Sequence, residues 1–60
     1  MINRIILGKS YLFQGQIVKV LKHKKAFTPF VPSMVKVEDQ KGFTNEHLAH
    51  YFRLNAEAIK

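Results

Sequence analysis

Gly15-Gln-Ile-Val-Lys-Val-Leu-Lys-His-Lys-Lys25 is the stretch from which the rest of the chain can be interpreted. Its first half has aliphatic residues on both alternating faces, with Val18 and Val20 on one of them. This pattern predicts a strand that is central in a sheet or strongly curved. Its second half, residues 22–25, consists of three lysines and one histidine. We expect that half to extend past the core as a basic arm.

The residues before this stretch predict a first strand and a turn. Residues 2–7 are rich in β-branched residues and predict a short strand. Gly8-Lys9-Ser10 predicts a turn, and Tyr11-Leu-Phe13 predicts either a strand or a loop packed on the core. Gln14-Gly15-Gln16 then predicts a bulge, a sharp bend or a tight turn, because glycine adopts backbone conformations that other residues avoid.

Two prolines shape the segment after the basic arm. Pro29 and Pro32 lie within residues 26–33 and exclude a regular helix there, because each proline fixes φ and removes a backbone donor. The residues before the prolines are held extended as well. We therefore expect an extended loop whose apolar side chains pack back onto the core, namely Phe27, Phe30 and Val31.

Met34-Val-Lys-Val-Glu-Asp39 has the alternation of a half-buried strand, with Val35 and Val37 facing the same way. Asp39-Gln-Lys-Gly42 predicts a type I turn, since Asp is favoured at its first position and Gly at its last. Phe43 would then begin a short return strand.

The C-terminal residues predict a helix. Thr44 or Asn45 suits the N-cap, and residues 46–54 form the body of the expected helix. We expect it to continue to about residue 58, unless Asn55 ends it in a left-handed conformation. The apolar residues with helical spacing are Leu48, Tyr51, Phe52, Ala56 and Ile59.

Length and composition limit the class of protein. Sixty residues make a single domain (1–60) with a marginal core, since a chain of this size buries only about 60% of its unfolded surface. There is no cysteine, which excludes disulfides and thiolate zinc sites. No stretch approaches the ~20 apolar residues of a membrane-spanning helix or the about 7–15 of a signal peptide. We therefore expect a cytoplasmic protein with no membrane partner.

The net charge of +6 is concentrated in the N-terminal half. Residues 1–25 contain six basic and no acidic residues, whereas residues 26–60 contain four of each. This asymmetry indicates an acidic partner for the N-terminal half. Two alternatives remain: the charge serves solubility, or the lysines protect a sheet edge from aggregation.

The sequence contains no pattern typical of catalysis. Glu38 and Asp39 are adjacent and would point to opposite faces of a strand, and there is no phosphate-binding loop or nucleophile elbow. We therefore expect no enzyme, no small-molecule substrate and no cofactor. His47 and His50 would share a helix face, but no third ligand stands at a diagnostic spacing. We expect a solvated face there and no metal.

The hydrophobic spacing resembles that of small SH3-like β-barrel proteins over residues 2–45. The resemblance is carried by Gly15-x-Ile17-Val18-x-Val20, by Met34-Val35-x-Val37 and by the turn at Gly42. That group includes translation-associated barrels of the KOW type, small phage-encoded barrels and an accessory subunit of photosystem I. The resemblance implies a binding scaffold. The chain departs from it in having Lys22-His-Lys-Lys25 where a KOW motif has further glycines, and in having no Trp.

The expected fold class is therefore mainly β (α+β). A strongly curved, SH3-like antiparallel sheet or barrel would cover about residues 2–44, with a C-terminal α-helix over about residues 45–58. A core this small needs most of its large side chains, and we expect Phe13, Phe43 and Phe52 inside it. The aromatic residues that flank the basic segment are the candidates for exposure: Tyr11, Phe27 and Phe30.

The leading hypothesis is a non-enzymatic binding module whose basic half engages an acidic partner, with nucleic acid slightly favoured. One alternative is a phage-type adaptor or inhibitor that docks on an acidic protein surface. Another is a structural subunit of a larger complex or a homodimer, and the oligomeric state is left open. The candidate partner-binding residues are Arg4, Lys9, Tyr11, Lys19, Lys22, His23, Lys24, Lys25, Phe27 and Phe30.

Overall fold

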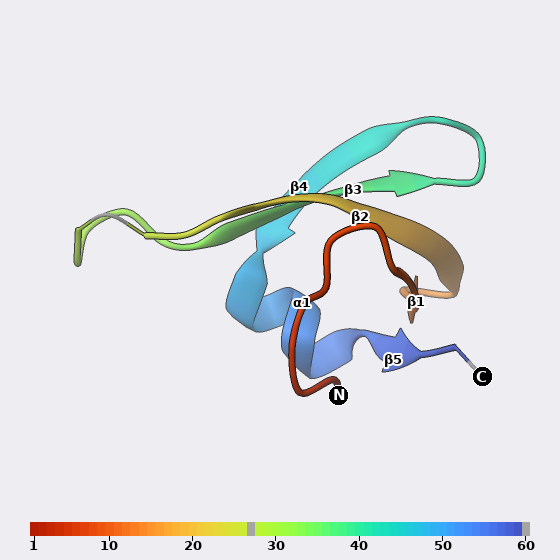
Figure 1. The fold of residues 1–60 in the computed structure, drawn as a ribbon, viewed down its shortest axis with the longest axis horizontal. Coiled ribbons are helices and arrows are strands. Elements are labelled where there is room, and N and C mark those ends of the chain that lie inside the picture. The colour runs from red at the N-terminus through yellow and green to blue at the C-terminus, as the bar shows by residue number, and fades with distance from the viewer. Residues whose placement is uncertain (27, 60) are drawn as a thin grey trace.

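The chain forms one curved antiparallel sheet with a short helix packed under it, as Figure 1 shows. The structure is a computed structural model that describes residues 1–26 and 28–59. The elements in chain order are β1 (Ser10–Phe13), β2 (Gln16–Lys24), β3 (Met34–Asp39), β4 (Thr44–Leu48), α1 (Ala49–Asn55) and β5 (Glu57–Ala58).

The strand order is β4-β3-β2-β1-β5, and each neighbouring pair is antiparallel. The long strand β2 is therefore central, as its two apolar faces predicted. β4 and β5 lie at the two edges, and no pairing between them is present among residues 1–26 and 28–59. A mainly β fold with one short helix is confirmed, but the strands do not close into a barrel.

The β1–β2 connection is a two-residue turn. Gln14 and Gly15 both have positive φ, at 53° and 76°, and Phe13 pairs directly with Gln16 on either side of them. Such turns match the right-handed twist of the two strands, and glycine enters the left-handed region without steric cost. Of the three alternatives that the sequence allowed here, the tight turn is the one that forms.

The β3–β4 connection is built on Asp39. Its carboxylate accepts hydrogen bonds from the backbone N–H of Lys41 (2.9 Å) and of Phe43 (3.0 Å). The N–H of Gly42, at φ 92°, donates to the Asp39 carbonyl at 3.1 Å. The predicted turn over residues 39–42 is therefore confirmed, and β3 has the predicted bounds.

The core lies between one face of the sheet and α1. Val18 and Val20 of β2 lie on the same face as Val35 and Val37 of β3, and all four are buried beside Phe52 of the helix. The alternation in both strands therefore predicted the core correctly. The buried residues of the described chain are Ile2, Tyr11, Phe13, Val18, Val20, Val35, Val37, Ala49, Phe52 and Ala56.

The N-terminal segment is not the strand predicted over residues 2–7. Its backbone finds partners outside the sheet: the N–H of Ile2 donates to the carbonyl of Arg53 on α1 at 3.0 Å. The hydroxyl of Tyr11 provides two further hydrogen bonds. Because a helix and a side chain satisfy these backbone groups, the segment has no need of a neighbouring strand.

The helix starts later and ends earlier than predicted. Residues 44–48 were predicted as the N-cap and first turn of the helix but form β4, which pairs with β3 from Met34 opposite Leu48 to Glu38 opposite Thr44. Pairing along a whole strand outweighs a local helical preference. The continuation to residue 58 is also wrong, because β5 pairs with β1. Residues 49–54 are helical, as predicted.

Three predictions about large side chains are wrong. Phe30 and Val31 do not pack back onto the core, since both are exposed on the β2–β3 loop, and for Phe30 the alternative prediction of exposure is confirmed. Phe43 is exposed, because it lies in the β3–β4 connection and outside the residues that pack as the core. Tyr11 is only 2% exposed, since β1 places it on the inner face opposite Val18. Phe27 lies outside the described residues.

Candidate functional site

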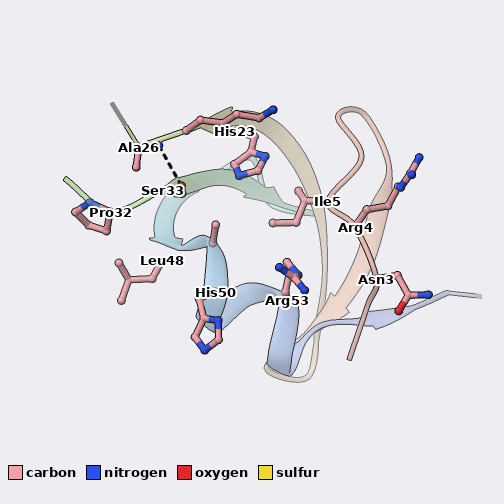
Figure 2. A pocket seen from close by; sticks show the side chains of 12 residues that line it. Asn3, Arg4, Ile5, His23, Ala26, Pro32, Ser33, Leu48, His50 and Arg53 are labelled. Carbon is pink, nitrogen blue, oxygen red and sulfur yellow. Dashed lines mark hydrogen bonds between the residues drawn. The ribbon is translucent and has the colours of Figure 1, made fainter. Parts of the chain in front are cut away.

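A groove of about 840 Å³ opens between three segments that are distant in the sequence. They are the N-terminal segment, the base of the loop between β2 and β3, and the helix α1 with the end of β4. Figure 2 shows Ile5, His23 and Arg53 pointing toward one another across the groove, while Arg4 and His50 extend at its rim. The lining residues are Asn3, Arg4, Ile5, His23, Lys25, Ala26, Pro32, Ser33, Leu48, Ala49, His50 and Arg53.

The groove is basic. Arg4 and Lys25 come from two of the segments and Arg53 from the third, and His23 and His50 add two imidazoles. Among the described residues, no Asp or Glu lines it. Two guanidinium groups and one ammonium around one hollow create a local positive potential, which attracts anions from solution. The groove is therefore suited to a negatively charged ligand that also offers some apolar surface.

A β-bulge decides which side chains of the basic arm face the groove. The register between β2 and β3 shifts between Val20 and Lys22, which leaves Leu21 as the extra residue. After the shift, His23 pairs with buried Val35 and so lies on the inner face. Bulges change the direction of side chains in this way, since one added residue reverses the alternation of the strand. Without the shift, His23 would share the outer face with Lys19.

The N-terminal segment is held beside the groove by Tyr11. The N–H of Ile6 donates to the Tyr11 hydroxyl, which itself donates to the carbonyl of Arg4, both at 3.2 Å. These bonds fix the backbone on either side of Ile5, which packs against the core. Tyr11 was predicted to contact a partner directly. Its role in this structure is to position Arg4 and Ile5.

Tyr11→Phe is expected to destabilise the protein by about 1–2 kcal/mol, because it leaves two partly buried backbone groups without a partner. The loss is measured by urea unfolding, with faster amide hydrogen exchange at Ile6 as the local signal. Tyr51→Phe is the matched control, since its hydroxyl only accepts an exposed hydrogen bond from Gln14. Equal losses in the two variants would contradict the positioning role.

The outer face of the sheet carries lysines that have acidic neighbours. Lys19 pairs directly with Glu38 on β3. The ammonium of Lys24 on β2 donates a 2.7 Å hydrogen bond to the carboxylate of Glu46 on β4. That hydrogen bond and the charge of Lys24 lower the pKa of Glu46, with smaller contributions from Lys36 and Lys22. The outer-face charges therefore cancel in part, which leaves the groove as the acid-poor surface.

The structure separates the residues that the sequence grouped as one binding face. Three of them line the groove: Arg4, His23 and Lys25. Lys19, Lys22 and Lys24 lie on the outer face. The others lie elsewhere: the ammonium of Lys9 is 5.6 Å from the ring centre of Tyr11, Tyr11 is buried, Phe30 is exposed on the loop, and Phe27 is outside the described residues.

Among the basic groove residues, sequence reasoning missed two, His50 and Arg53. Both lie in the half of the chain whose charges cancel, so composition gave no reason to choose them. Arg53 reaches the groove because α1 packs under the sheet and its carbonyl at residue 53 binds the N–H of Ile2. Only this tertiary contact brings the N-terminal segment and the helix together.

The histidines do not form the paired helix face that was predicted. His47 lies on β4 and its ring is 4.8 Å from that of Phe13, whereas His50 lies on α1. Within residues 1–26 and 28–59, no three His, Cys, Asp or Glu side chains gather as metal ligands would. The same residues include no helix with the length and apolar character needed to span a bilayer.

Comparisons with protein-family models, with curated proteins and with solved structures found no match to this chain. The groove residues are therefore the evidence from which a function can be inferred.

Proposed function

We propose that this protein is a non-enzymatic module that binds nucleic acid through the basic groove. The observation that carries the proposal is that five Arg, Lys and His residues from three separate segments line one hollow, which no acid lines among the residues that the structure describes. Clustering of this kind on one face is the electrostatic footprint of a nucleic-acid-binding domain. It also follows the charge asymmetry of the sequence, since Arg4, His23 and Lys25 belong to the acid-free half.

The composition of the groove fits a sugar–phosphate chain better than a small anion. Its arginines match phosphate oxygens in bidentate geometry, and its lysine acts as a point charge. Apolar side chains between them, including Ile5, Pro32 and Leu48, offer surface for sugars and base faces. Contacts of this kind position a nucleic acid without reading its sequence.

The same proposal keeps the resemblance to SH3-like barrels, which are binding scaffolds. The resemblance is supported by the five-stranded antiparallel sheet with a buried inner face and by the one short helix of the described chain. A cytoplasmic location is part of this proposal. A phage origin finds no support in the structure or in the comparisons, and the oligomeric state stays open.

The direct test is binding of labelled duplex DNA, single-stranded DNA and RNA across a salt series. We expect affinity to fall linearly on a log–log plot against salt, with a slope of about −0.9 for each phosphate contact on duplex DNA and about −0.7 on single strands. Absence of binding to all three at low salt would sink the proposal. Binding with no salt dependence would also contradict it, because phosphate contacts release counterions.

Glu46→Gln is expected to tighten nucleic-acid binding at neutral pH. The lowered pKa keeps Glu46 ionised and bonded to Lys24, and the substitution makes that lysine available to phosphate. One added contact increases the salt slope by about 0.9 and the affinity by about eightfold at about 0.1 M salt.

On acidification, the nucleic-acid affinity of the wild-type protein should approach that of the Glu46→Gln variant. A carboxylate with a lowered pKa keeps its interaction above its ordinary pKa and loses it only as pH falls through the lowered value. The difference between Glu46→Gln and wild type should therefore persist down to the ordinary carboxyl pKa of 4.5 and shrink only at lower pH. Glu57→Gln on β5 is the matched control, since it removes the same charge away from Lys24. Equal gains in both variants would show that only total charge matters.

A second candidate function, docking on one protein, is favoured by a separate hollow. It measures about 590 Å³ and has apolar side chains from Leu12 and Ile17 on the outer face and from Phe43 beside the β3–β4 turn. Affinity capture with and without nuclease discriminates the two functions. A single stoichiometric protein that survives nuclease treatment, and whose capture Phe43→Ala abolishes, would favour docking.

A further inference from the structure

The tip of the β2–β3 hairpin, residues 28–31, is a hydrogen-bonded turn that presents an aromatic side chain. The N–H of Val31 donates to the carbonyl of Thr28, and the N–H of Phe30 donates to the hydroxyl of Thr28. Both distances are 3.3 Å. Pro29 follows Thr28 at a turn position where its fixed φ fits, and Pro32 limits the residue before it. Two hydrogen bonds and two prolines therefore reduce the freedom of the loop around Phe30.

Phe30 projects from this turn with 91% of its surface exposed, and Val31 beside it is 51% exposed. An aromatic ring exposed to water contributes no burial energy to folding. The small core of a 60-residue chain would gain stability from each phenylalanine buried in it. Neither residue packs on the core cluster. The turn thus holds apolar surface outward at the end of the molecule, where Figure 1 shows the hairpin extending away from the helix.

The strands that carry this tip are basic. Residues 1–37 contain no Asp or Glu, so the whole ribbon from Val20 to Val37 lacks an acid of its own. Lys22 and Lys24 lie on its outer face, and Lys36 pairs directly with Lys22. Lys25 directly follows β2, at the base of the loop, and lines the groove. An apolar tip on a ribbon of this charge is complementary to a surface that combines phosphates with stacked, apolar bases.

We propose that the β2–β3 ribbon enters the minor groove of duplex DNA and that Phe30 inserts between two base pairs as a wedge. This inference rests on the proposed nucleic-acid binding and narrows it to a duplex that is bent on binding. Two-stranded ribbons fit DNA grooves, and apolar side chains that unstack a base step kink the duplex by about 20–90°. The lysines of the ribbon contact phosphates on both sides of the minor groove.

The position of the basic groove supports this mode. The groove is lined by His23 at the end of β2 and by Lys25 and Pro32 of the loop, and the tip of the same loop carries Phe30. A kink at the tip bends DNA toward the major groove and lets more of its backbone approach the protein. Binding then favours flexible pyrimidine–purine steps, because these deform at the lowest energy.

The test compares Phe30→Ala with wild type on a duplex of about 30 bp that has a central TA step and a fluorophore pair at its ends. Energy transfer between the ends reports bending, and anisotropy reports affinity. We expect Phe30→Ala to lose the bend and to bind about 5- to 150-fold more weakly, as expected when a stacking aromatic is removed. Its salt slope should also flatten, because the unbent duplex brings fewer phosphates to the protein.

Phe43→Ala is the matched control, since Phe43 is also exposed and lies in the other hairpin connection. It should retain the bend, and unfolding curves should show both variants folded. The inference is overturned if Phe30→Ala bends and binds the duplex as wild type does, or if wild type binds only single strands. Loss of a captured protein partner in Phe30→Ala, with duplex binding unchanged, would also overturn it. Wild-type protein that binds no nucleic acid at all rejects the proposed function itself, which is a different result.

Discussion

Replacing Lys25 and Arg53 together by alanine is expected to weaken duplex DNA binding about 60-fold at about 0.1 M salt. Lys25 directly follows β2 and Arg53 lies in α1, and both line the groove. Each lost phosphate contact lowers log K by about 0.9 at this salt concentration and flattens the salt slope by about 0.9. Fluorescence anisotropy across a salt series measures both quantities on the same samples.

The charge-matched control is Lys19→Ala with Lys41→Ala. It removes the same net charge, but Lys19 lies opposite Glu38 on the outer face and Lys41 lies in the β3–β4 turn. We expect a much smaller loss of affinity, with a nearly unchanged slope. Equal losses in the two double variants would show that the groove has no special part in binding and that the protein responds only to total charge.

The second large effect is expected from Phe52→Ala, which should leave most of the protein unfolded at 37 °C. Phe52 is 0% exposed, and its ring centre is 4.8 Å from that of Phe13 and 5.8 Å from that of Tyr11. Removing a buried phenylalanine costs about 3–5 kcal/mol. The total stability of a 60-residue domain is only about 3–9 kcal/mol.

Leu54→Ala is the control for this prediction, because it changes the same helix at an exposed position. Its effect should stay below about 1 kcal/mol. Circular dichroism during urea unfolding measures both variants. A Phe52→Ala protein that unfolds at nearly the same urea concentration as wild type would contradict the packing of α1 against the sheet.

The central hairpin and the third strand were predictable because their signals are local. Alternation of apolar residues in β2 and β3 predicts one buried face, and the valines at 18, 20, 35 and 37 are indeed buried together. Gly15 and the Asp39–Gly42 sequence specify turns by their own backbone preferences. In these segments the pattern along the chain and the final packing require the same conformation.

The two ends of the chain were wrongly predicted because their structure depends on distant partners. Residues 44–48 have the cap and first-turn residues of a helix, but the free edge of β3 is satisfied by a strand. Residues 2–7 have strand-like composition, but their backbone binds Arg53 and Tyr11. Hydrogen-bond satisfaction over the whole sheet outweighs propensities of a few tenths of a kcal/mol for each residue.

The candidate site divides in the same way. The sequence alone determined that the positive charge of this protein lies in its first 25 residues, and that its central strand passes from apolar to basic, because charge and alternation are properties of the chain itself. The tertiary structure decided which of those charges act together. A bulge after Val20 turned His23 inward, and α1 brought Arg53 to the groove that Arg4 also lines. Both depend on register and packing between segments far apart in the chain, for which no local sequence carries a signal.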